Sequence, residues 1–220
     1  ISQLVTCFSD KVDNFSIKNN KFESLNKQID RLQSIKDKKE KGSKKYIKVN
    51  KTFRKKKRRL TNKLKDFQHK VSRKIVDICK ESEIDKLIVG DIQVKKIIDS
   101  DNKKIKSTSK NFGLSRFKTF LEYKSKNENI GFYKIDESLT TQINCLTGKK
   151  EFKGIPLSQR EVWLNELIKI DRDLNSAINI YKKATGICSI HFLETISNFS
   201  YLNKMYFNTR KNVLEYEKYL

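Results

Sequence analysis

The sequence predicts an α/β fold, in which a mixed sheet carries helices and an antiparallel helical hairpin is inserted between its strands. Three observations predict it: short runs of apolar and β-branched residues, long segments with an apolar residue at every third or fourth position, and polar stretches between them. The implied order is strand, strand, helical hairpin, strand, helix, strand, small insertion, helix. A mixed sheet with helices packed on it suits that order.

Four segments are predicted to be strands. Residues 1–10 favour a pleated surface ending in a turn, and residues 15–17 are predicted to form a short second strand. Residues 84–92 contain a continuous apolar run, as in a strand covered on both faces. Residues 131–136 alternate apolar and polar side chains, which is typical of a half-buried strand.

Three segments before the final motif are predicted to be helical. Residues 21–41 and 49–83 each carry an apolar stripe, and Gly42-Ser43 breaks the pattern between them. Such a pair should form an antiparallel hairpin. Residues 113–126 form the third helix, whose aromatic side chains we assign to the core rather than to base stacking.

Two polar or weakly patterned segments complete the chain. Residues 97–111 are predicted to be a mobile loop near the site. Residues 186–220 show helical spacing of apolar side chains without a motif. We expect helical docking of this tail, with a poorly ordered tail as the alternative.

The charge of the chain points to a polyanionic partner. Its 220 residues hold 49 Lys+Arg against 26 Asp+Glu, a formal net charge of +23. That excess would bind a polyanion strongly. A membrane surface competes with nucleic acid as that partner, but no apolar run approaches the ~20 residues of a spanning helix. We therefore expect a nucleic-acid-binding protein of the cytoplasm, associated with the nucleoid, with no membrane partner.

Six consecutive basic residues form the densest charge in the chain. They lie within the second predicted helix and are Arg54, Lys55, Lys56, Lys57, Arg58 and Arg59. The alternative interpretation is a solvated helix face. Because like charges repel and an anionic partner relieves that repulsion, we favour a surface that contacts phosphates. Such contacts position a nucleic-acid backbone without reading its sequence.

The cysteines argue against zinc and disulfides. Cys7, Cys79, Cys145 and Cys188 lie far apart, with no Cys-x-x-Cys pair. Free thiols in a reducing compartment are the expectation.

Two acids stand at the start of the last predicted helix. Asp171 and Asp173 flank Arg172, and apolar residues then recur at helical spacing to Tyr181. Either acid is suited to cap the helix, which alone accounts for the pattern. Acids held against a close-packed neighbour also suit a divalent-metal site. Arg172 either contacts a phosphate or pairs with Asp171.

Residues 171–180, Asp-Arg-Asp-Leu-Asn-Ser-Ala-Ile-Asn-Ile, resemble the last nuclease motif of the TnpB (OrfB) family, which are transposon-encoded, RNA-guided DNA nucleases related to type V CRISPR effectors. The resemblance implies a ribonuclease H-like, RuvC-type domain in which Asp173 is the final metal-binding aspartate. It also implies that the first catalytic aspartate lies upstream of Ile1, so that the first strand of the domain is missing here.

The second nuclease motif departs from the family pattern. The family carries Glu then Asp at the end of the strand, whereas this sequence has Gly90 then Asp91. Either Asp91 has taken over metal binding or the site is impaired. An Asp after an apolar strand is also a common turn residue.

Residues 139–169 resemble the place of a four-cysteine zinc finger in the family, of which only Cys145 and Gly148 remain. We therefore expect no zinc, and an insertion that binds the target nucleic acid and is held by a small apolar core. The expected core residues are Phe152, Ile155, Leu157, Val162 and Leu164. We place Trp163 in that core, with an exposed stacking residue as the alternative.

The resemblance divides the chain into a nuclease domain (1–20 and 84–185), a basic hairpin (21–83), the insertion (139–169) and the tail. It implies phosphodiester hydrolysis with Mg²⁺ or Mn²⁺ held by Asp173 and Asp91. Guide RNA and target DNA are the implied partners, contacted by the six basic residues and by Arg116 and Arg172. Two other hypotheses stay open: a nuclease-dead regulator that binds nucleic acid, and a basic helical binding protein without an active site.

Overall fold

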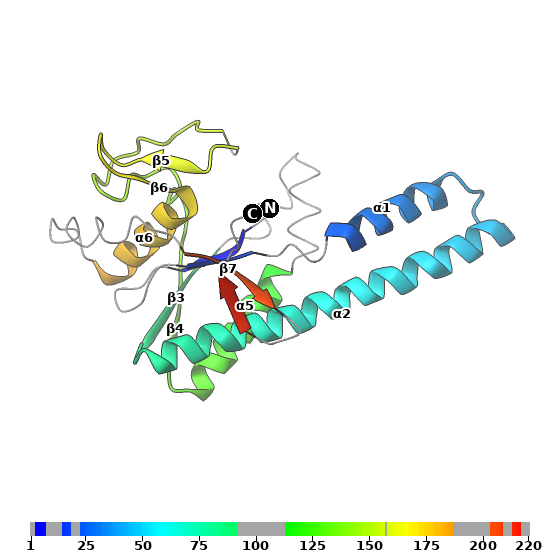
Figure 1. Ribbon diagram of the computed structural model, residues 1–220, viewed down its shortest axis with the longest axis horizontal. Helices are drawn as coiled ribbons and strands as arrows, with labels where there is room; N and C mark the ends of the chain where they lie inside the picture. Colours follow the sequence, from blue (N-terminus) through cyan, green and yellow to red (C-terminus); the bar gives the residue numbers. More distant parts are fainter. Residues whose placement is uncertain are drawn as a thin grey trace.

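The computed structural model describes residues 3–7, 15–18, 23–91, 113–156, 158–186, 203–208 and 213–216, with side chains in the parts of these that lie between 24 and 186. These residues form a mixed α/β fold of helices and three small sheets (Figure 1). The sequence predicted helices and strands along the chain in the observed order as far as α6. The single mixed sheet that it predicted is divided into small sheets in the described residues.

The first sheet joins the two ends of the chain. Its order is β1 (Gln3–Cys7), β2 (Phe15–Lys18), β7 (Asn203–Asn208) and β8 (Val213–Tyr216). β2 and β7 are parallel, and the other neighbours are antiparallel. The prediction of a helical tail is therefore wrong for β7 and β8. Hydrogen bonding to a strand about 190 residues away outweighs a weak local helical spacing.

The second sheet positions the candidate site. β3 (Lys86–Gly90) pairs in parallel with β4 (Gly131–Ile135), so that Gly90 lies opposite Ile135. The backbone N–H of Asp91 donates to the carbonyl of Ile135 at 2.7 Å, which extends the pairing by one residue. Parallel strands need a crossover, and α5 (Leu114–Asn127) lies within it. The two strands therefore end side by side.

The two helices of the predicted hairpin are present with shifted bounds. α1 spans Glu23–Asp37, and α2 spans Lys44–Glu81, starting five residues before the prediction. Ser43 Oγ accepts a hydrogen bond from the N–H of Tyr46 at 3.1 Å. A residue that the sequence suggested as a breaker is thus the N-cap of α2, because a serine outside the helix satisfies a free N–H of its first turn.

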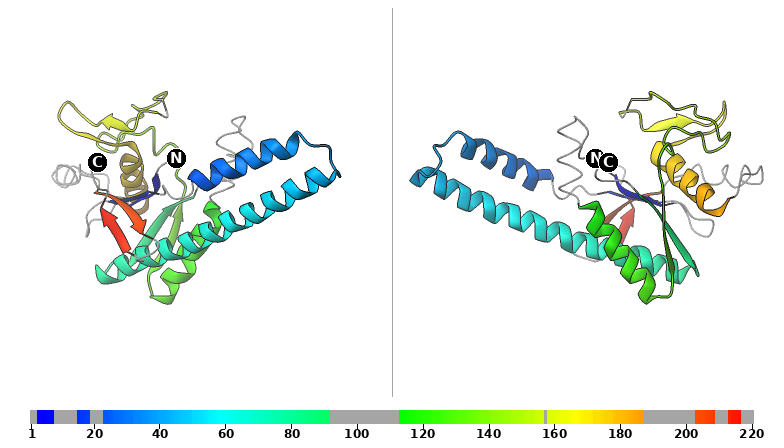
Figure 2. Two further views of the ribbon diagram at one scale, coloured as in Figure 1. Left: turned by 45° about the vertical axis from the view of Figure 1, so that its right-hand side comes forward. Right: turned by 180° about the vertical axis from the view of Figure 1, so that it is seen from behind.

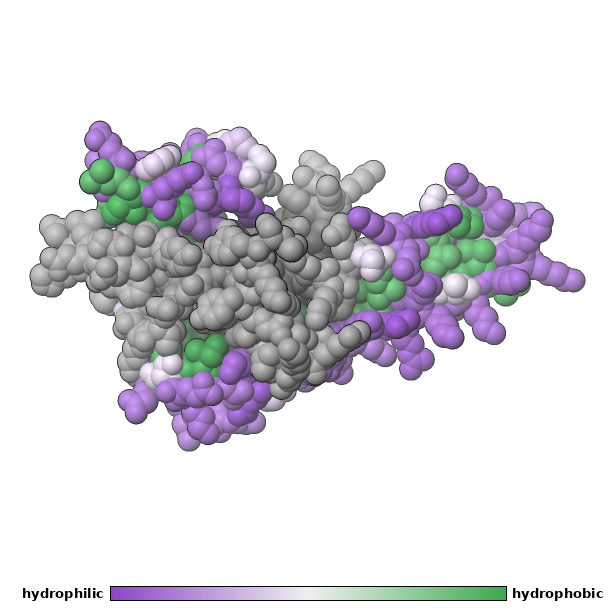
Figure 3. All heavy atoms as spheres, in the orientation of Figure 1, coloured by the Kyte–Doolittle hydropathy of each residue, from purple (hydrophilic) through white to green (hydrophobic). Residues whose placement is uncertain are grey.

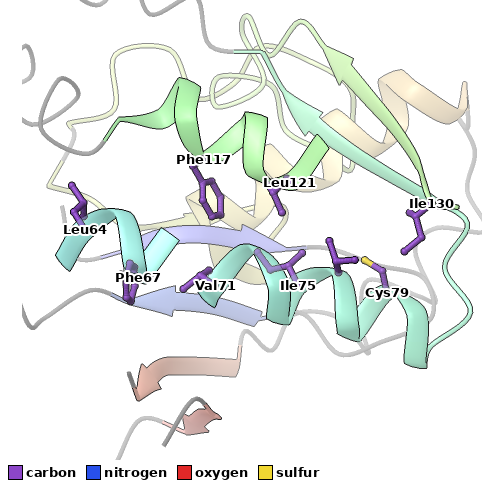
Figure 4. Close-up of a cluster of buried hydrophobic side chains, with 9 residues drawn as sticks. Leu64, Phe67, Val71, Ile75, Cys79, Phe117, Leu121 and Ile130 are labelled. Carbon is purple, nitrogen blue, oxygen red and sulfur yellow. The ribbon is translucent and has the colours of Figure 1, made fainter. Parts of the chain in front are cut away.

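The main core lies between the C-terminal half of α2 and α5. Leu64, Phe67, Val71, Ile75 and Cys79 point from one face of α2 toward Phe117 and Leu121 of α5 (Figure 4). Val71 and Val76 are fully buried. The prediction that the aromatic residues of α5 belong to the core is confirmed for Phe117 and Phe120, which are buried, and is wrong for Tyr123, which is 41% exposed.

The N-terminal half of α2 extends away from that core with α1 beside it (Figures 1 and 2). We call α1 together with residues 38–63 the arm. Its helices contact one another through half-buried apolar side chains, with polar side chains outward (Figure 3). Lys56 Nζ donates to Gln28 Oε1 across the pair, and the Lys36 ammonium lies 4.7 Å from the ring centre of Phe53.

A second, smaller core supports the insertion. β5 (Glu161–Trp163) and β6 (Lys169–Asp171) form an antiparallel hairpin that leads into α6 (Arg172–Thr185). Phe152, Val162 and Leu164 are buried in this core as predicted, while Ile155 packs at its edge. Leu157 lies outside the described residues.

Trp163 does not lie in this core, and its prediction as a core residue is wrong. Its side chain is 56% exposed, because alternation along β5 turns Val162 inward and Trp163 outward. The predicted loop at 97–111 falls outside the described residues. Within the part of the chain that the structure describes, no helix is long and apolar enough to span a bilayer.

Candidate carboxylate site and nucleic-acid surface

Asp91 stands at the end of β3, where the sequence placed a candidate metal ligand. Its carboxylate is half exposed and accepts from Lys118 Nζ of α5 at 2.9 Å. The Lys118 side chain is itself largely buried, since only 13% of it is exposed. This ion pair holds the Asp91 carboxylate at the C-terminal end of the strand.

Glu137 brings a second carboxylate to the same strand ends. It follows β4 by two residues, and a Cβ at position 90 would overlap its Oε2 atom. The Glu137 carboxylate therefore occupies the space that a side chain of residue 90 would fill. Burial raises the pKa of Glu137, and the negative charges of Asp136 and Asp91 raise it further, while Lys118 opposes them.

The sequence reasoning did not select Glu137. Two features of the sequence pointed to Glu137: it is an acid just beyond a predicted strand, and another predicted strand has a glycine where the family has an acid. Linking them required knowing that β3 and β4 are parallel neighbours that end together.

Asp173 lies in the first turn of α6. The helix is capped by Asp171, whose Oδ1 accepts from the N–H groups of Asp173 and Leu174. Of the two acids that the sequence offered as a cap, Asp171 fills that role, and the Asp173 carboxylate instead lies 3.4 Å from Arg160 Nη1. Burial raises the pKa of Asp173, as does the neighbouring charge of Asp171, whereas Arg160 and Arg172 lower it.

The structure brings Asp91 and Glu137 together but shows no contact between either and Asp173. α6 packs beside β3 and β4, and Ile180 Cδ1 would lie 3.0 Å from a Cβ at position 90. Asp173 lies seven residues before Ile180 on the same face of the helix. Among the described side chains, no group of three His, Cys, Asp or Glu is arranged to hold a metal ion.

Two predicted nucleic-acid contacts have internal partners. Arg116 Nε donates to Gln68 Oε1 at 2.7 Å, and Gln68 is fully buried between α2 and α5. Arg172 Nη1 donates to the carbonyl of Pro156 at 3.3 Å. Both side chains are half-buried, and both join neighbouring segments of the fold.

The basic run of α2 lies on the arm. Arg54, Lys55, Lys57, Arg58 and Arg59 are exposed, while Lys56 is half-buried against α1. Residues 44–63 hold eleven basic side chains and no acid. These are Lys44, Lys45, Lys48, Lys51, Arg54, Lys55, Lys56, Lys57, Arg58, Arg59 and Lys63. α1 instead holds three basic and three acidic residues, so the positive charge belongs to α2.

Comparison with protein families gives two matches that together follow most of the chain. Residues 1–95 match a family described as "Probable transposase". Residues 115–180 match a family described as "Cas12f1-like, TNB domain". The second match includes nearly all of α5, then β4, the insertion and most of α6.

Curated relatives come from Acanthamoeba polyphaga mimivirus. TnpB-like proteins L79 and L770 are each 32% identical over 164 residues, covering 71% of this chain and 30% of the relative. TnpB-like protein R854 is also 32% identical, with 29% of its length covered. The chain thus spans about a third of the length of the relatives that it matches.

A solved structure has a similar fold. It is described as the cryo-EM structure of the Cas12f1–sgRNA–target DNA complex. The alignment covers 78% of this chain and 44% of the chain in that structure, with a TM-score of 0.54. At 15% sequence identity, this likeness concerns the fold alone.

Proposed function

The chain belongs to the TnpB family, and we propose that it is part of an RNA-guided DNA endonuclease whose carboxylates take part in the hydrolysis of phosphodiester bonds. One observation carries this proposal: the Glu137 carboxylate fills the place that Gly90 leaves at the end of β3. An acid expected on one strand is thus supplied by the next. The proposed domain is ribonuclease H-like, with the arm as its inserted hairpin.

The proposed site consists of Asp91, Glu137 and Asp173. Carboxylate oxygens are the ligands that Mg²⁺ and Mn²⁺ prefer, and these cations would activate water and stabilise the leaving oxygen at the scissile phosphate. Lys118 pairs with Asp91, and its charge opposes the rise in the pKa of Glu137 that burial causes. Two residues orient Asp173. Asp171 caps its helix, and Arg160 forms an ion pair of 3.4 Å with its carboxylate.

In the proposed complex, a guide RNA would pair with the target DNA and read its sequence, while the arm would contact the phosphates of the duplex. The eleven basic residues at 44–63 support this role, since all but Lys56 are exposed and no acid lies among them. The arm projects beyond the cores, which leaves this surface accessible (Figure 2).

The test of the site is a carboxylate swap in the full-length protein. Glu137→Gln is expected to lower guide-dependent cleavage by at least ~100-fold. It removes a negatively charged ligand of the cation that would stabilise the transition state. Gly90→Glu combined with Glu137→Ala should recover much of the lost activity, since it returns the carboxylate to the same space from β3. Glu83→Gln, an exposed acid outside the site, is the matched control.

Normal cleavage by Glu137→Gln would remove Glu137 from the site. Normal cleavage by Asp173→Asn would end the nuclease assignment for this motif. Mn²⁺ binding followed by electron paramagnetic resonance gives a readout independent of turnover: wild type and the swap variant should bind the ion, and Glu137→Gln should bind it more weakly.

One observation favours a second candidate, a nucleic-acid-binding regulator without cleavage. Asp91 and Asp173 are each engaged by a basic side chain, and no metal-binding group of three is arranged among the described residues. This candidate predicts guide-dependent binding of target DNA with no cutting by the full-length protein at any concentration of Mg²⁺ or Mn²⁺. Detectable cleavage that depends on Asp173 would exclude it.

A further inference from the structure

Trp163 is an exposed apolar side chain next to the smaller core that β5, β6 and α6 form. It lies on β5 with 56% of its surface exposed, although Val162 and Leu164 on either side are almost fully buried. Leu167, at the turn of the same hairpin, is 89% exposed.

The hairpin fixes the backbone at Trp163. Trp163 pairs with Lys169 across β5 and β6, and the Leu164 N–H donates to the carbonyl of Ile168 at 2.8 Å. Asn165 Oδ1 accepts from the N–H groups of Leu167 and Ile168, which fixes the turn. An aromatic side chain on a pre-ordered strand loses little conformational entropy when it binds a flat partner.

A cation lies over the ring. The Lys169 ammonium is 5.6 Å from the ring centre of Trp163 and also pairs with Glu161. An exposed aromatic ring with an adjacent cation is the arrangement that stacks a nucleic-acid base and contacts its phosphate. Two exposed apolar side chains offer far less than the ~800 Å² per partner that a stable protein interface buries.

The hairpin is continuous with the candidate site. Glu161 pairs with Asp171, which caps α6, and Arg160 contacts the Asp173 carboxylate. Strand residues advance by about 3.3 Å, so Trp163 lies roughly 7 Å along the hairpin from Asp171. That separation is comparable to the length of a nucleotide in an extended strand.

We propose that Trp163 stacks on an unpaired base and so positions a single strand of nucleic acid across the hairpin toward Asp173. The inference rests on the proposed function, and it assigns a positioning role to one residue. Stacking requires an exposed base face, so the site should accept single strands and reject duplexes. The arm, in contrast, binds phosphates of either form.

The test uses the 220-residue chain, whose only tryptophan is Trp163. Its fluorescence is titrated with a twelve-residue oligo(dT), with oligo(rU) of the same length, and with a blunt DNA duplex, while anisotropy of labelled nucleic acid reports total binding. We expect saturable quenching by single strands and little quenching by the duplex. Equal quenching by oligo(rU) and oligo(dT) would make the site general for single strands, and stronger quenching by oligo(dT) would make it a DNA site.

Variants give the second measurement. Trp163→Ala should bind oligo(dT) about tenfold more weakly, in line with the loss of one stacked base, and should bind the duplex as wild type does. Trp163→Tyr should retain most of the affinity. Leu167→Ala, an exposed neighbour that stacks poorly, is the matched control.

Bound oligo(dT) without quenching, together with unchanged affinity of Trp163→Ala, would overturn this inference and leave the basic arm as the binding surface. Absence of binding to every nucleic acid would overturn the proposed function and the inference together. Far-ultraviolet circular dichroism confirms that each variant is folded.

Discussion

The two halves of α2 have opposite surroundings although they belong to one continuous helix. Every buried residue of α2 lies from Leu64 onward, whereas residues 44–63 hold eleven basic side chains, no acid and no fully buried residue. The C-terminal half is a core element, and the N-terminal half is a charged arm. A helix of this length keeps the charged residues away from the core, where their mutual repulsion would oppose folding.

The largest expected effect is a loss of DNA affinity on removing charge from the N-terminal half of α2. The variant changes four exposed basic residues of the arm to Gln: Arg54, Lys55, Arg58 and Arg59. Because it removes phosphate contacts, we expect duplex DNA to bind on the order of 100-fold more weakly. Each lost contact should also reduce the slope of log K against log salt by about 0.9. Anisotropy between 50 and 200 mM KCl measures both quantities. The matched control is Lys27→Gln with Arg31→Gln on the electrically balanced α1, which should change affinity little. A salt-independent affinity of wild type would contradict the assignment of the arm.

The packed half should respond in the opposite way. Ile75→Ala removes a side chain that is 97% buried in the main core, and it should lower the free energy of unfolding by about 3 kcal/mol. Urea unfolding measures the change, and duplex affinity of the folded variant should stay within a factor of two. Val49→Ala on the half-buried stripe of the arm should cost less than half as much. Equal costs at the two positions would show that the arm and the core unfold as one unit.

A buried lysine gives the packed half a pH dependence. Burial lowers the pKa of Lys124 to about 8, and its Nζ donates to Ser72 Oγ at 2.8 Å and to the carbonyl of His69. Arg73 lowers this pKa further and Asp77 opposes the shift, while the rings of Phe120 and Tyr123 lie near the ammonium.

The unfolded chain binds more protons than the folded chain between the folded pKa of about 8 and the ordinary lysine value of 10.5. The contribution of Lys124 to the free energy of unfolding should therefore rise with pH across this window, by at most about 3 kcal/mol. Urea unfolding at pH 7.5, 9 and 10.5 measures the slope. Lys124→Met should flatten that slope, and an unchanged slope in this variant would assign it to other groups.

The smallest expected effect concerns the start of the arm. Ser43→Ala removes the side-chain acceptor for the Tyr46 N–H and should cost about 1 kcal/mol of local helix stability. Hydrogen exchange in the first turn of α2 should accelerate about fivefold, with no change at Val71. Ser43→Asp, which can still cap, should exchange like wild type. Faster exchange along the whole helix would contradict the independence of the two halves.

The sequence predicted more of the helices than of the sheets. The apolar stripes of α1 and α2 are local patterns, so the hairpin was predictable to within a few residues. β7 and β8 were not, because their partners lie at the other end of the chain. The same reason explains the candidate site: Asp173 and Asp91 are visible next to their own elements, whereas Glu137 becomes meaningful only when β4 lies beside Gly90.

The sequence by itself determined the strong positive charge of the protein, the helical hairpin, the capped start of α6 and the family motif around Asp173, since each follows from composition or from a few turns of chain. Only the tertiary structure decided which acid fills the space beside Gly90, which basic residues hold other parts of the fold together, and that Trp163 faces outward. Those outcomes depend on which strand pairs with which, and pairing brings together residues that no local pattern connects.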